Sequence, residues 1–210
     1  MRTALIWAQE ERIIERALKI ERPPKPAPKE RYLTRTEIDQ LLSVEMAPHI
    51  RVAIILMLTT AGRVGAILDL TWTRVDFERG QINLRIDEIG PRKGRAVVPM
   101  NSMLRAALQD TRQAALSESV VEWAGGRVQS IRTGFNAALE AAGLKDVSPH
   151  VLRHTAAVDM AAAGVPISKI SQYLGHSNTA ITERVYARFA PDHMIEAAAV
   201  LEFGGPRKVR

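Results

Sequence analysis

The sequence predicts a mainly α-helical fold with a small antiparallel β-sheet, an α+β domain. Most of the chain places apolar residues among charged ones at the spacing of amphipathic helices. Two short segments, 74–85 and 94–100, alternate apolar and polar residues or are rich in β-branched residues, and they lie around turn-forming glycines and a proline, as in a sheet of two or three strands. Apolar residues make up 46% of the 210 residues, enough to bury a core.

The N-terminal segment has the pattern of a helix followed by a linker. Residues 3–21 carry apolar residues at helical spacing, which predicts a helix. A single helix cannot bury its own apolar stripe, so it either docks on the rest of the chain or belongs to a further domain. Four prolines follow between Pro23 and Pro28, a composition typical of a stiff, extended linker. We therefore expect a domain boundary over residues 22–31.

Capping residues define the remaining elements. Thr34 and Glu37 form a capping-box pattern that opens a helix through Leu42. Ser148 followed by Pro149 is the pattern of an N-cap with proline in the first helical turn. Further helices are expected over 49–60, 103–116, 128–142, 148–164, 166–175, from 179 onward and over 193–203, with the strands between 74 and 100.

Charge and composition narrow the classes of function. Lys and Arg total 29 against 23 Asp and Glu, a net charge of +6, which favours nucleic acid first and an anionic membrane surface second as partner. The absence of cysteine excludes disulfides, thiolate zinc sites and a cysteine nucleophile. The N-terminus lacks the apolar region of a signal peptide, and the longest apolar run, Val52–Leu58, is too short to span a bilayer. We expect a cytoplasmic protein with no membrane partner.

The segment Ser148–Thr155, SPHVLRHT, concentrates cationic and proton-transfer groups at the start of a predicted helix. Residues three or four apart share a helix face, so His150 can lie beside Arg153 or beside His154. The second pairing has the spacing of two zinc-binding histidines, but the charge of an arginine on the same face opposes the binding of a divalent cation. For His154 alone, a structural role within the helix bundle is the expectation.

Other residues occur in a fixed order around this segment. Arg63 follows a long apolar helix and a glycine, Lys93 lies in the turn between the predicted strands, and His176 and Tyr186 come later in the C-terminal third. This ordered set, with His-x-Leu-Arg-His-Thr and then Leu-Gly-His before a tyrosine, resembles the tyrosine recombinase or phage integrase family over roughly residues 31 to 200.

The resemblance implies a site-specific recombinase, which cuts and rejoins DNA strands through a 3′-phosphotyrosyl intermediate. Tyr186 would be the nucleophile, His150 the base that takes its proton, and Lys93 the acid that protonates the leaving 5′ oxygen. Tyrosine has a pKa near 10 and needs such help to attack. The implied catalytic residues are Arg63, Lys93, His150, Arg153, His176 and Tyr186.

The residue types suit a phosphodiester under attack, on which negative charge develops. Arginine binds phosphate oxygens in fork geometry and stays protonated throughout. Fixed donors aimed at developing charge contribute about 3 kcal/mol each, and Arg63 and Arg153 are the candidates. His176 resembles the position that hydrogen-bonds the scissile phosphate. A covalent intermediate conserves the bond energy, so the resemblance implies no cofactor and no metal.

Two features depart from the family pattern. The acidic residue that the family usually carries three positions after its first arginine is Ala66 here, and Asp69 is a candidate substitute. The turn lysine has the arginine neighbours Arg92 and Arg95, but only Lys93 can readily donate a proton because the pKa of arginine exceeds 12.

The resemblance also implies a domain organisation. Residues 1–21 correspond to the last helix of a core-binding domain that is mostly missing, 22–31 to the linker, 32–203 to the catalytic integrase domain and 204–210 to a basic tail. The chain would then be an excised fragment or a truncated gene product such as a prophage remnant. The implied partners are double-stranded DNA and further copies of the chain, four on DNA in the family, with a monomer left open in its absence. The apolar segment Met194–Phe203 suits contact with a neighbouring copy as well as folding back on its own domain.

Two other functions remain open at this point. A catalytically silent DNA-binding remnant of an integrase is favoured by Ala66 and by the missing domain. A metallohydrolase would use the imidazoles of His150, His154 and His176, but carboxylates are lacking near them in the sequence. The recombinase is the reading that uses the whole ordered set, in a bacterial or phage-encoded protein.

Overall fold

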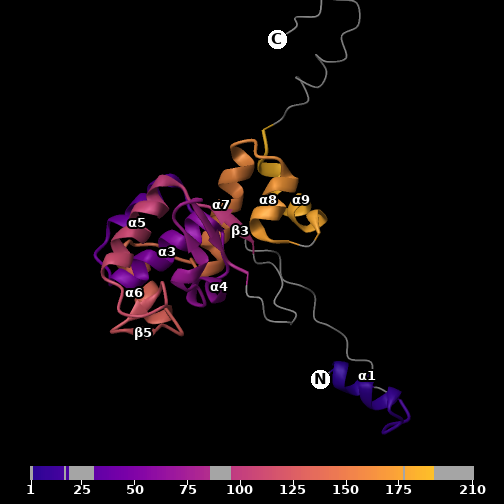
Figure 1. The fold of residues 1–210 in the computed structure, drawn as a ribbon. Coiled ribbons are helices and arrows are strands. Elements are labelled where there is room, and N and C mark those ends of the chain that lie inside the picture. Colours follow the sequence, from indigo (N-terminus) through magenta and orange to yellow (C-terminus); the bar gives the residue numbers. More distant parts are fainter. Residues whose placement is uncertain (1, 17, 19–30, 86–95, 177, 192–210) are drawn as a thin grey trace, which may run out of the picture. The chain divides into compact units, whose positions relative to one another are not determined.

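The computed structural model describes residues 2–16, 18, 31–85, 96–176 and 178–191. The chain divides into two compact units, residues 1–30 and 31–210 (Figure 1). The division falls at the end of the proline-rich segment over which the sequence predicts a linker.

The first unit contains one helix, shorter than expected. Helix α1 spans Arg2–Glu10, and turns follow it as far as Arg16, with Arg12 in the left-handed region at φ 57°. The prediction of a helix through residue 21 is therefore wrong in extent. Glu10 and Glu11 give a physical reason, because two carboxylates at a helix C-terminus oppose the negative end of the helix dipole.

The second unit is mainly helical with two small antiparallel sheets, which confirms the predicted fold class. Its elements in chain order are α2 (Arg35–Ser43), α3 (Pro48–Thr60), α4 (Val64–Leu68), η1 (Trp72–Arg74), β1 (Val75–Asp76), β2 (Gln81–Asn83), β3 (Val97–Pro99), α5 (Ser102–Gln113), β4 (Glu122–Trp123), β5 (Gly126–Arg127), α6 (Arg132–Ala141), α7 (Pro149–Ala162), α8 (Ile167–Leu174), α9 (Thr179–Tyr186) and η2 (Ala187–Phe189).

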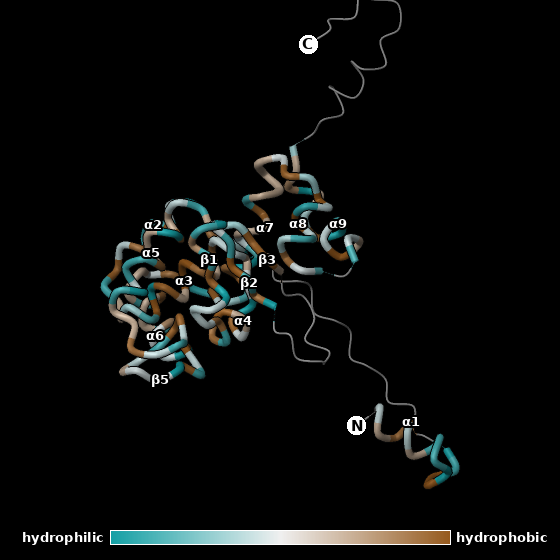
Figure 2. The backbone as a smooth tube through the Cα atoms, in the orientation of Figure 1, coloured by the Kyte–Doolittle hydropathy of each residue, from teal (hydrophilic) through white to brown (hydrophobic). Residues whose placement is uncertain are grey.

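Helix α3 is the centre of the main core. Its residues are apolar around the whole helix, as expected for a buried one, and α5 and α7 pack against it (Figure 2). Strands β1, β2 and β3 form the larger sheet in that order, with Val75 opposite Ile82 and Ile82 opposite Val98. These three side chains are buried and add the sheet's inner face to the core around α3.

Helix α7 joins two hydrophobic clusters. Its Leu152 belongs to the main cluster around α3, whereas Ala157, Val158 and Ala161 belong to a second, smaller cluster with residues of α8 and α9. Figure 1 shows α7 beside both groups of helices. A side chain on α7 between these two clusters therefore lies where α7, α8, α9 and the end of α3 meet.

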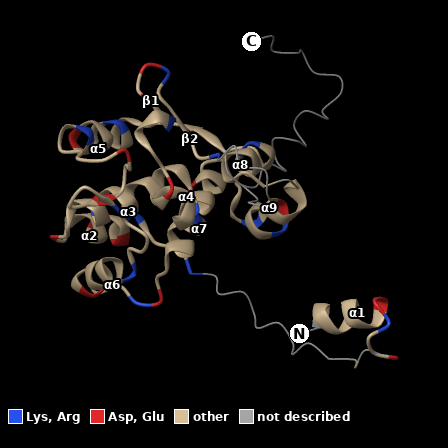
Figure 3. Ribbon diagram, turned by 60° about the horizontal axis from the view of Figure 1, so that its bottom comes forward, with Lys and Arg blue, Asp and Glu red and all other residues tan. Residues whose placement is uncertain are grey.

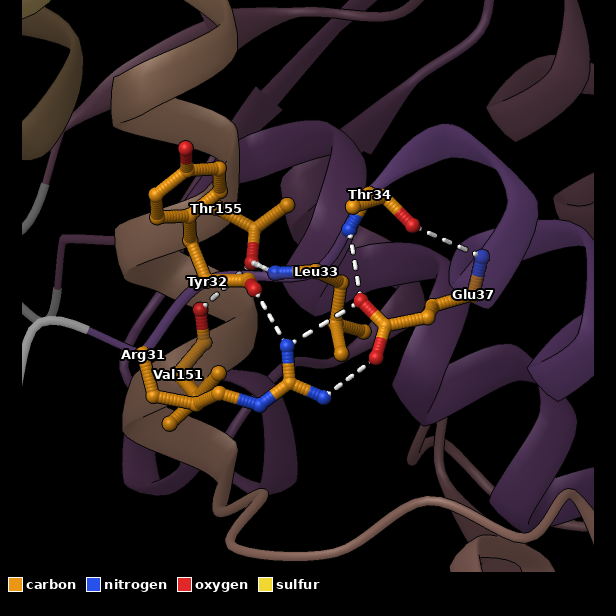
Figure 4. Close-up of polar contacts among 7 residues, drawn as sticks. All are labelled: Arg31, Tyr32, Leu33, Thr34, Glu37, Val151 and Thr155. Atoms are coloured by element: carbon orange, nitrogen blue, oxygen red, sulfur yellow. Dashed lines mark hydrogen bonds and ion pairs between the residues drawn. The ribbon is translucent and has the colours of Figure 1, made fainter.

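The predicted caps are mostly present. Thr34 and Glu37 form a complete capping box, in which the Thr34 hydroxyl accepts from the Glu37 amide and the Glu37 carboxylate accepts from the Thr34 amide (Figure 4). Asn101 caps α5 by accepting from the Leu104 amide. Ser148 occupies the N-cap position of α7, but its side chain makes no capping hydrogen bond.

Several elements differ from expectation. The short helix α4 and the hairpin β4–β5 were not predicted, and α5 ends at Gln113, three residues earlier than expected. Helix α6 begins at Arg132 instead of residue 128 because the preceding residues form the hairpin, whose turn places Ala124 at φ 50° and Gly125 at φ 75°. The predicted helix over 193–203 and the turn that carries Lys93 lie outside the described residues.

Basic and acidic residues are interspersed over α5, α6 and α9 in the view of Figure 3. The net positive charge of the chain is therefore not gathered into one uniform stripe along these helices. Among the described helices, none combines the length and the apolar character that a membrane crossing requires.

Candidate active site

Arg153 lies on the buried face of α7, between the two hydrophobic clusters, and is only 4% exposed. Its guanidinium donates to two backbone carbonyls, that of Ala61 at 2.5 Å and that of Leu174 at 2.9 Å. It also donates to Nε2 of His176 at 3.1 Å. The end of α3, the last residue of α8 and the second residue after α8 thus all converge on one arginine.

The charge of Arg153 is not neutralised by an ion pair with any carboxylate that the structure describes. Among the described residues, the ion pairs involve other arginines, and only neutral groups hydrogen-bond to Arg153. Burial and the nearby charge of Arg63 lower the pKa of Arg153 to about 10, so it remains protonated at neutral pH. A buried cation solvated only by dipoles favours the arrival of an anion.

His176 follows Gly175, which ends α8 in the left-handed conformation at φ 66° and turns the chain toward Arg153. Because arginine has only donors, Nε2 of His176 must accept from Arg153. The neutral ring then carries its proton on Nδ1 and donates to the Thr182 hydroxyl at 2.8 Å. Burial and the charges of Arg153 and Arg63 lower the pKa of His176, in agreement with this neutral form.

Arg63 and His150 line the exposed side of the same region. Arg63 is the N-cap residue of α4 and is reached through a tight turn, in which Ala61 is left-handed at φ 49° and a Cβ on Gly62 would lie 2.7 Å from Ile67 Cδ1. His150 is exposed in the first turn of α7. Its pKa is lowered by partial burial and by the charges of Arg153 and Arg63, so it is neutral at neutral pH.

Tyr186, the last residue of α9, is 8% exposed and belongs to the second cluster. Its hydroxyl hydrogen-bonds Nδ1 of His154 at 3.2 Å, not His150. Burial raises the pKa of Tyr186, and the charge of Arg153 acts in the opposite direction. The tyrosine expected to act as nucleophile is therefore neutral, inside the fold and within electrostatic reach of the buried arginine.

The structure thus brings together four of the six predicted site residues: besides burial, the charges of Arg153 and Arg63 lower the pKa of both His150 and His176, and the charge of Arg63 lowers the pKa of Arg153. Tyr186 lies next to this cluster, coupled to it through Arg153. Lys93 lies outside the described residues.

The sequence reasoning missed the part that His154 and Thr182 play at the site. His154 was expected to be structural, yet it contacts the Tyr186 hydroxyl, and Thr182 fixes the ring of His176. The signal for His154 was its place directly after Arg153, since neighbouring residues on a helix point about 100° apart and so can serve two adjacent surfaces. No sequence signal pointed to Thr182.

Asp69, the suggested substitute for the missing acidic residue, is engaged elsewhere. Its carboxylate accepts from Arg127 of the β4–β5 hairpin, which also donates to the Leu68 carbonyl at 3.2 Å. Ala66 is buried in the main cluster. Asp69 therefore binds the hairpin to the end of α4.

The three histidines of the metallohydrolase hypothesis have separate partners. His154 faces Tyr186, His176 faces Arg153 and Thr182, and His150 is exposed. No group of three or more His, Asp, Glu or Cys side chains that could hold a metal occurs within the described ranges.

A sequence profile of the phage integrase family matches residues 31–193, about three quarters of the chain. The chain belongs to the phage integrase family.

Similar proteins agree with this assignment. The tyrosine recombinase XerA of Thermococcus onnurineus is 33% identical over 187 residues, which cover 84% of this chain and 64% of the relative. The catalytic domain of bacteriophage HP1 integrase has the same fold, with a TM-score of 0.62 at 23% identity over 84% of this chain and 98% of that domain. The Tn1549 transposon integrase, in a complex with circular intermediate DNA, gives a TM-score of 0.74 at 19% identity, over 95% of this chain and 76% of that one.

The match extends over only part of the relatives. This integrase-family chain spans about half to two thirds of the length of curated relatives that it matches. The activity of a whole recombinase is therefore a proposal for this chain.

Proposed function

We propose that residues 31–210 form a recombinase catalytic domain that cuts and rejoins DNA strands through a tyrosine. The single observation that carries the proposal is the buried guanidinium of Arg153, which has carbonyls and a neutral imidazole as its hydrogen-bond partners and lies beside Tyr186. A silent DNA-binding protein has no need for a buried, uncompensated cation next to a buried tyrosine. A phosphodiester is the anion that would use both groups.

The reaction would proceed by two exchanges at phosphorus. The Tyr186 oxygen attacks the scissile phosphorus and its proton passes to His150, which is neutral and can accept it. The bond from phosphorus to the 5′ oxygen breaks, and that oxygen takes a proton from Lys93. In the second exchange a 5′ hydroxyl attacks the phosphorus of the phosphotyrosyl link and gives its proton to Lys93. The bond from phosphorus to the tyrosine oxygen breaks, and His150 returns its proton to that oxygen.

A phosphate would change the protonation of the two imidazoles. Negative charge near a histidine raises its pKa, which opposes the lowering that Arg153 and Arg63 cause in the free protein. His176 can then gain a proton on Nε2 and donate to a phosphate oxygen, while Arg153 turns donors from carbonyls to the same phosphate. This gives the roles expected of His176 and Arg153 a physical basis.

Double-stranded DNA is the proposed partner. The net charge of +6 and the DNA complex of the similar Tn1549 integrase support it. We further propose that residues 1–21 belong to the core-binding part of a two-part clamp, with 22–31 as linker, and that four copies assemble on two DNA sites. A cytoplasmic location fits a protein that acts on DNA.

Covalent trapping tests the proposal. The protein is incubated in EDTA with a library of short nicked duplexes of randomised sequence, denatured in SDS and assayed for DNA attached to protein. We expect adducts with the wild type and with Tyr173→Phe, a second largely buried tyrosine whose hydroxyl donates to the Thr59 carbonyl, and none with Tyr186→Phe. DNA binding without any adduct would contradict the proposal and favour the silent remnant.

A further inference from the structure

The hydroxyl of Tyr186 has a specific partner that the proposed reaction does not use. Nδ1 of His154, on α7, lies 3.2 Å from the Tyr186 oxygen, and the two rings are 5.2 Å apart with an interplanar angle of 38°. A buried hydroxyl needs a partner, and this one receives it from a different helix. In either tautomer of His154, the bond fixes where the tyrosine oxygen points.

The imidazole of His154 is held in turn by two aromatic rings. Tyr32 and Phe189 each approach it edge-on, with ring centroids 6.4 Å away, and they contact each other at 5.6 Å. These T-shaped arrangements are the preferred geometry for aromatic pairs. Phe189 lies in η2, three residues beyond Tyr186. One of the two rings that contact His154 therefore comes from the segment that follows the tyrosine.

Tyr32 comes from the segment that begins the second unit, and this segment is anchored on both sides of Tyr32 (Figure 4). Arg31 forms a two-pronged ion pair with Glu37 at 2.5 and 3.0 Å and also donates to the Tyr32 carbonyl. The Leu33 amide donates to the Thr155 hydroxyl of α7 at 2.9 Å, and Leu33 is 1% exposed. The position of the Tyr32 ring is therefore set by α7 and α2.

We propose that His154 is a positioning residue for Tyr186, and that Tyr32 and Phe189 hold the His154 ring in place. The proposal deepens the proposed function, since it assumes that the tyrosine oxygen is the reacting atom. It assigns no proton transfer to His154. Its role is to keep the Tyr186 oxygen at one place beside the Arg153 cluster. The segment 31–33, which carries Tyr32, contributes to holding the His154 ring.

Two substitutions of His154 separate hydrogen bonding from packing. In His154→Asn, a side-chain amide occupies the place of Nδ1 and can keep the bond, whereas His154→Leu keeps the volume and loses it. Tyr32→Leu removes one of the two aromatic rings that contact His154. His49→Leu is the matched control, because His49 packs against Trp123 at a centroid distance of 4.9 Å, in another part of the second unit.

The first measurement does not depend on activity. Tyrosine labelled with ¹³C at Cζ gives a signal for Tyr186, assigned by its loss in Tyr186→Phe. We expect His154→Leu and Tyr32→Leu to shift this signal, while His154→Asn and His49→Leu leave it near the wild-type position. An unchanged Tyr186 signal in folded His154→Leu would overturn the proposal, whether or not the chain cuts DNA.

The second measurement is the rate of adduct formation in the trapping assay. We expect about a tenfold loss for His154→Leu, the size of effect of one lost hydrogen bond, and a loss of less than about threefold for His154→Asn. Shifts of the NMR signal without adducts from any variant would leave the positioning intact and refute the proposed function. Equal adduct rates for wild type and His154→Leu would refute the positioning role alone.

Discussion

At the scale of single residues, the site depends on charge that the fold leaves uncompensated. Arg153 is buried, protonated and hydrogen-bonded only to neutral groups among the described residues. Partial burial, together with the charges of Arg153 and Arg63, lowers the pKa of His150 and of His176, so both are neutral at neutral pH. The free protein thus holds a proton acceptor and an anion site side by side. An ion pair in place of this cluster would compete with the phosphate.

Replacing Arg153 by lysine tests that view. Lysine keeps the charge but cannot donate in fork geometry to two acceptors, so the rate of adduct formation is expected to fall about a hundredfold or more. Arg184→Lys, at an exposed position on α9, is the control and is expected to leave the rate unchanged. Rates are compared at saturating DNA, with the thermal unfolding midpoint as a check on folding. Full activity of Arg153→Lys would show that charge alone suffices.

The sequence named candidate site residues but could not give their contacts. Residue type, order and the family resemblance singled out Arg153 and His176 as candidates for binding phosphate. They could not reveal that the Tyr186 hydroxyl bonds His154, since that contact depends on the angle between α7 and α9. Neither could they reveal that Asp69 pairs with Arg127, 58 residues away in the sequence.

At the scale of elements, the sequence predicted correctly those helices and strands that are specified by their own residues. The capping box at Thr34, the continuous apolar run of α3 and the alternating strands on either side of the Gly80 turn each specify their element locally. The hairpin β4–β5 was missed because its strands have two residues each and are held by tertiary contacts. Helix α4, five residues long, is too short to show a helical period.

Glu37 gives a pH-dependent prediction. The ion pair with Arg31 and the capping bonds lower the pKa of Glu37 to about 2, below about 4.3 in an unfolded chain. The carboxylate therefore stabilises the fold above about pH 4.3, and this contribution is lost as the pH falls through about 2. We expect Glu37→Gln to lower the free energy of unfolding by about 1 kcal/mol at pH 7, and by only a small fraction of that near pH 2.

Denaturant unfolding across that pH range measures the difference. Glu140→Gln, at an exposed position of α6, is the control and is expected to differ little from wild type at any of these pH values. A Glu37→Gln deficit that stayed constant down to pH 2 would show that the carboxylate charge contributes nothing.

Two glycines give opposite predictions for the same substitution. A Cβ on Gly134 of α6 would lie 2.6 Å from Ile50 Cγ1 of α3, so Gly134→Ala is expected to destabilise the fold by about 1–3 kcal/mol. A Cβ on Gly65 of α4 meets nothing within 4 Å, so Gly65→Ala is expected to stabilise it by up to about 1 kcal/mol. The denaturant midpoints of the two variants measure these changes in stability. Equal effects at both sites would refute the close packing of α6 on α3.

At the scale of the whole molecule, the chain consists of two compact units, residues 1–30 and 31–210. The second has its own core, its own anchored first segment and the candidate site. The proline-rich segment made this boundary predictable from the sequence, because such a composition cannot form a packed core. The extent of α1 was not predictable from periodicity alone, which continues past the residue where the helix ends.

A pair of truncations tests whether the second unit folds by itself. Removal of residues 1–30 is expected to change the free energy of unfolding by less than about 0.5 kcal/mol. Removal of residues 1–37 also deletes the Arg31–Glu37 pair and the buried Leu33, and is expected to cost about 2–4 kcal/mol. Equal stability of the two truncated proteins would contradict the anchoring role of residues 31–37.

The most direct test of the central claim is to identify the residue that becomes attached to DNA. Covalent adducts isolated from the trapping assay are digested with protease and nuclease, and the modified peptide is sequenced by mass spectrometry. The account predicts a single nucleotide-linked peptide that carries the phosphate on Tyr186, joined to the 3′ end of the cut strand. A phosphate on any other residue, or on a 5′ end, would contradict it.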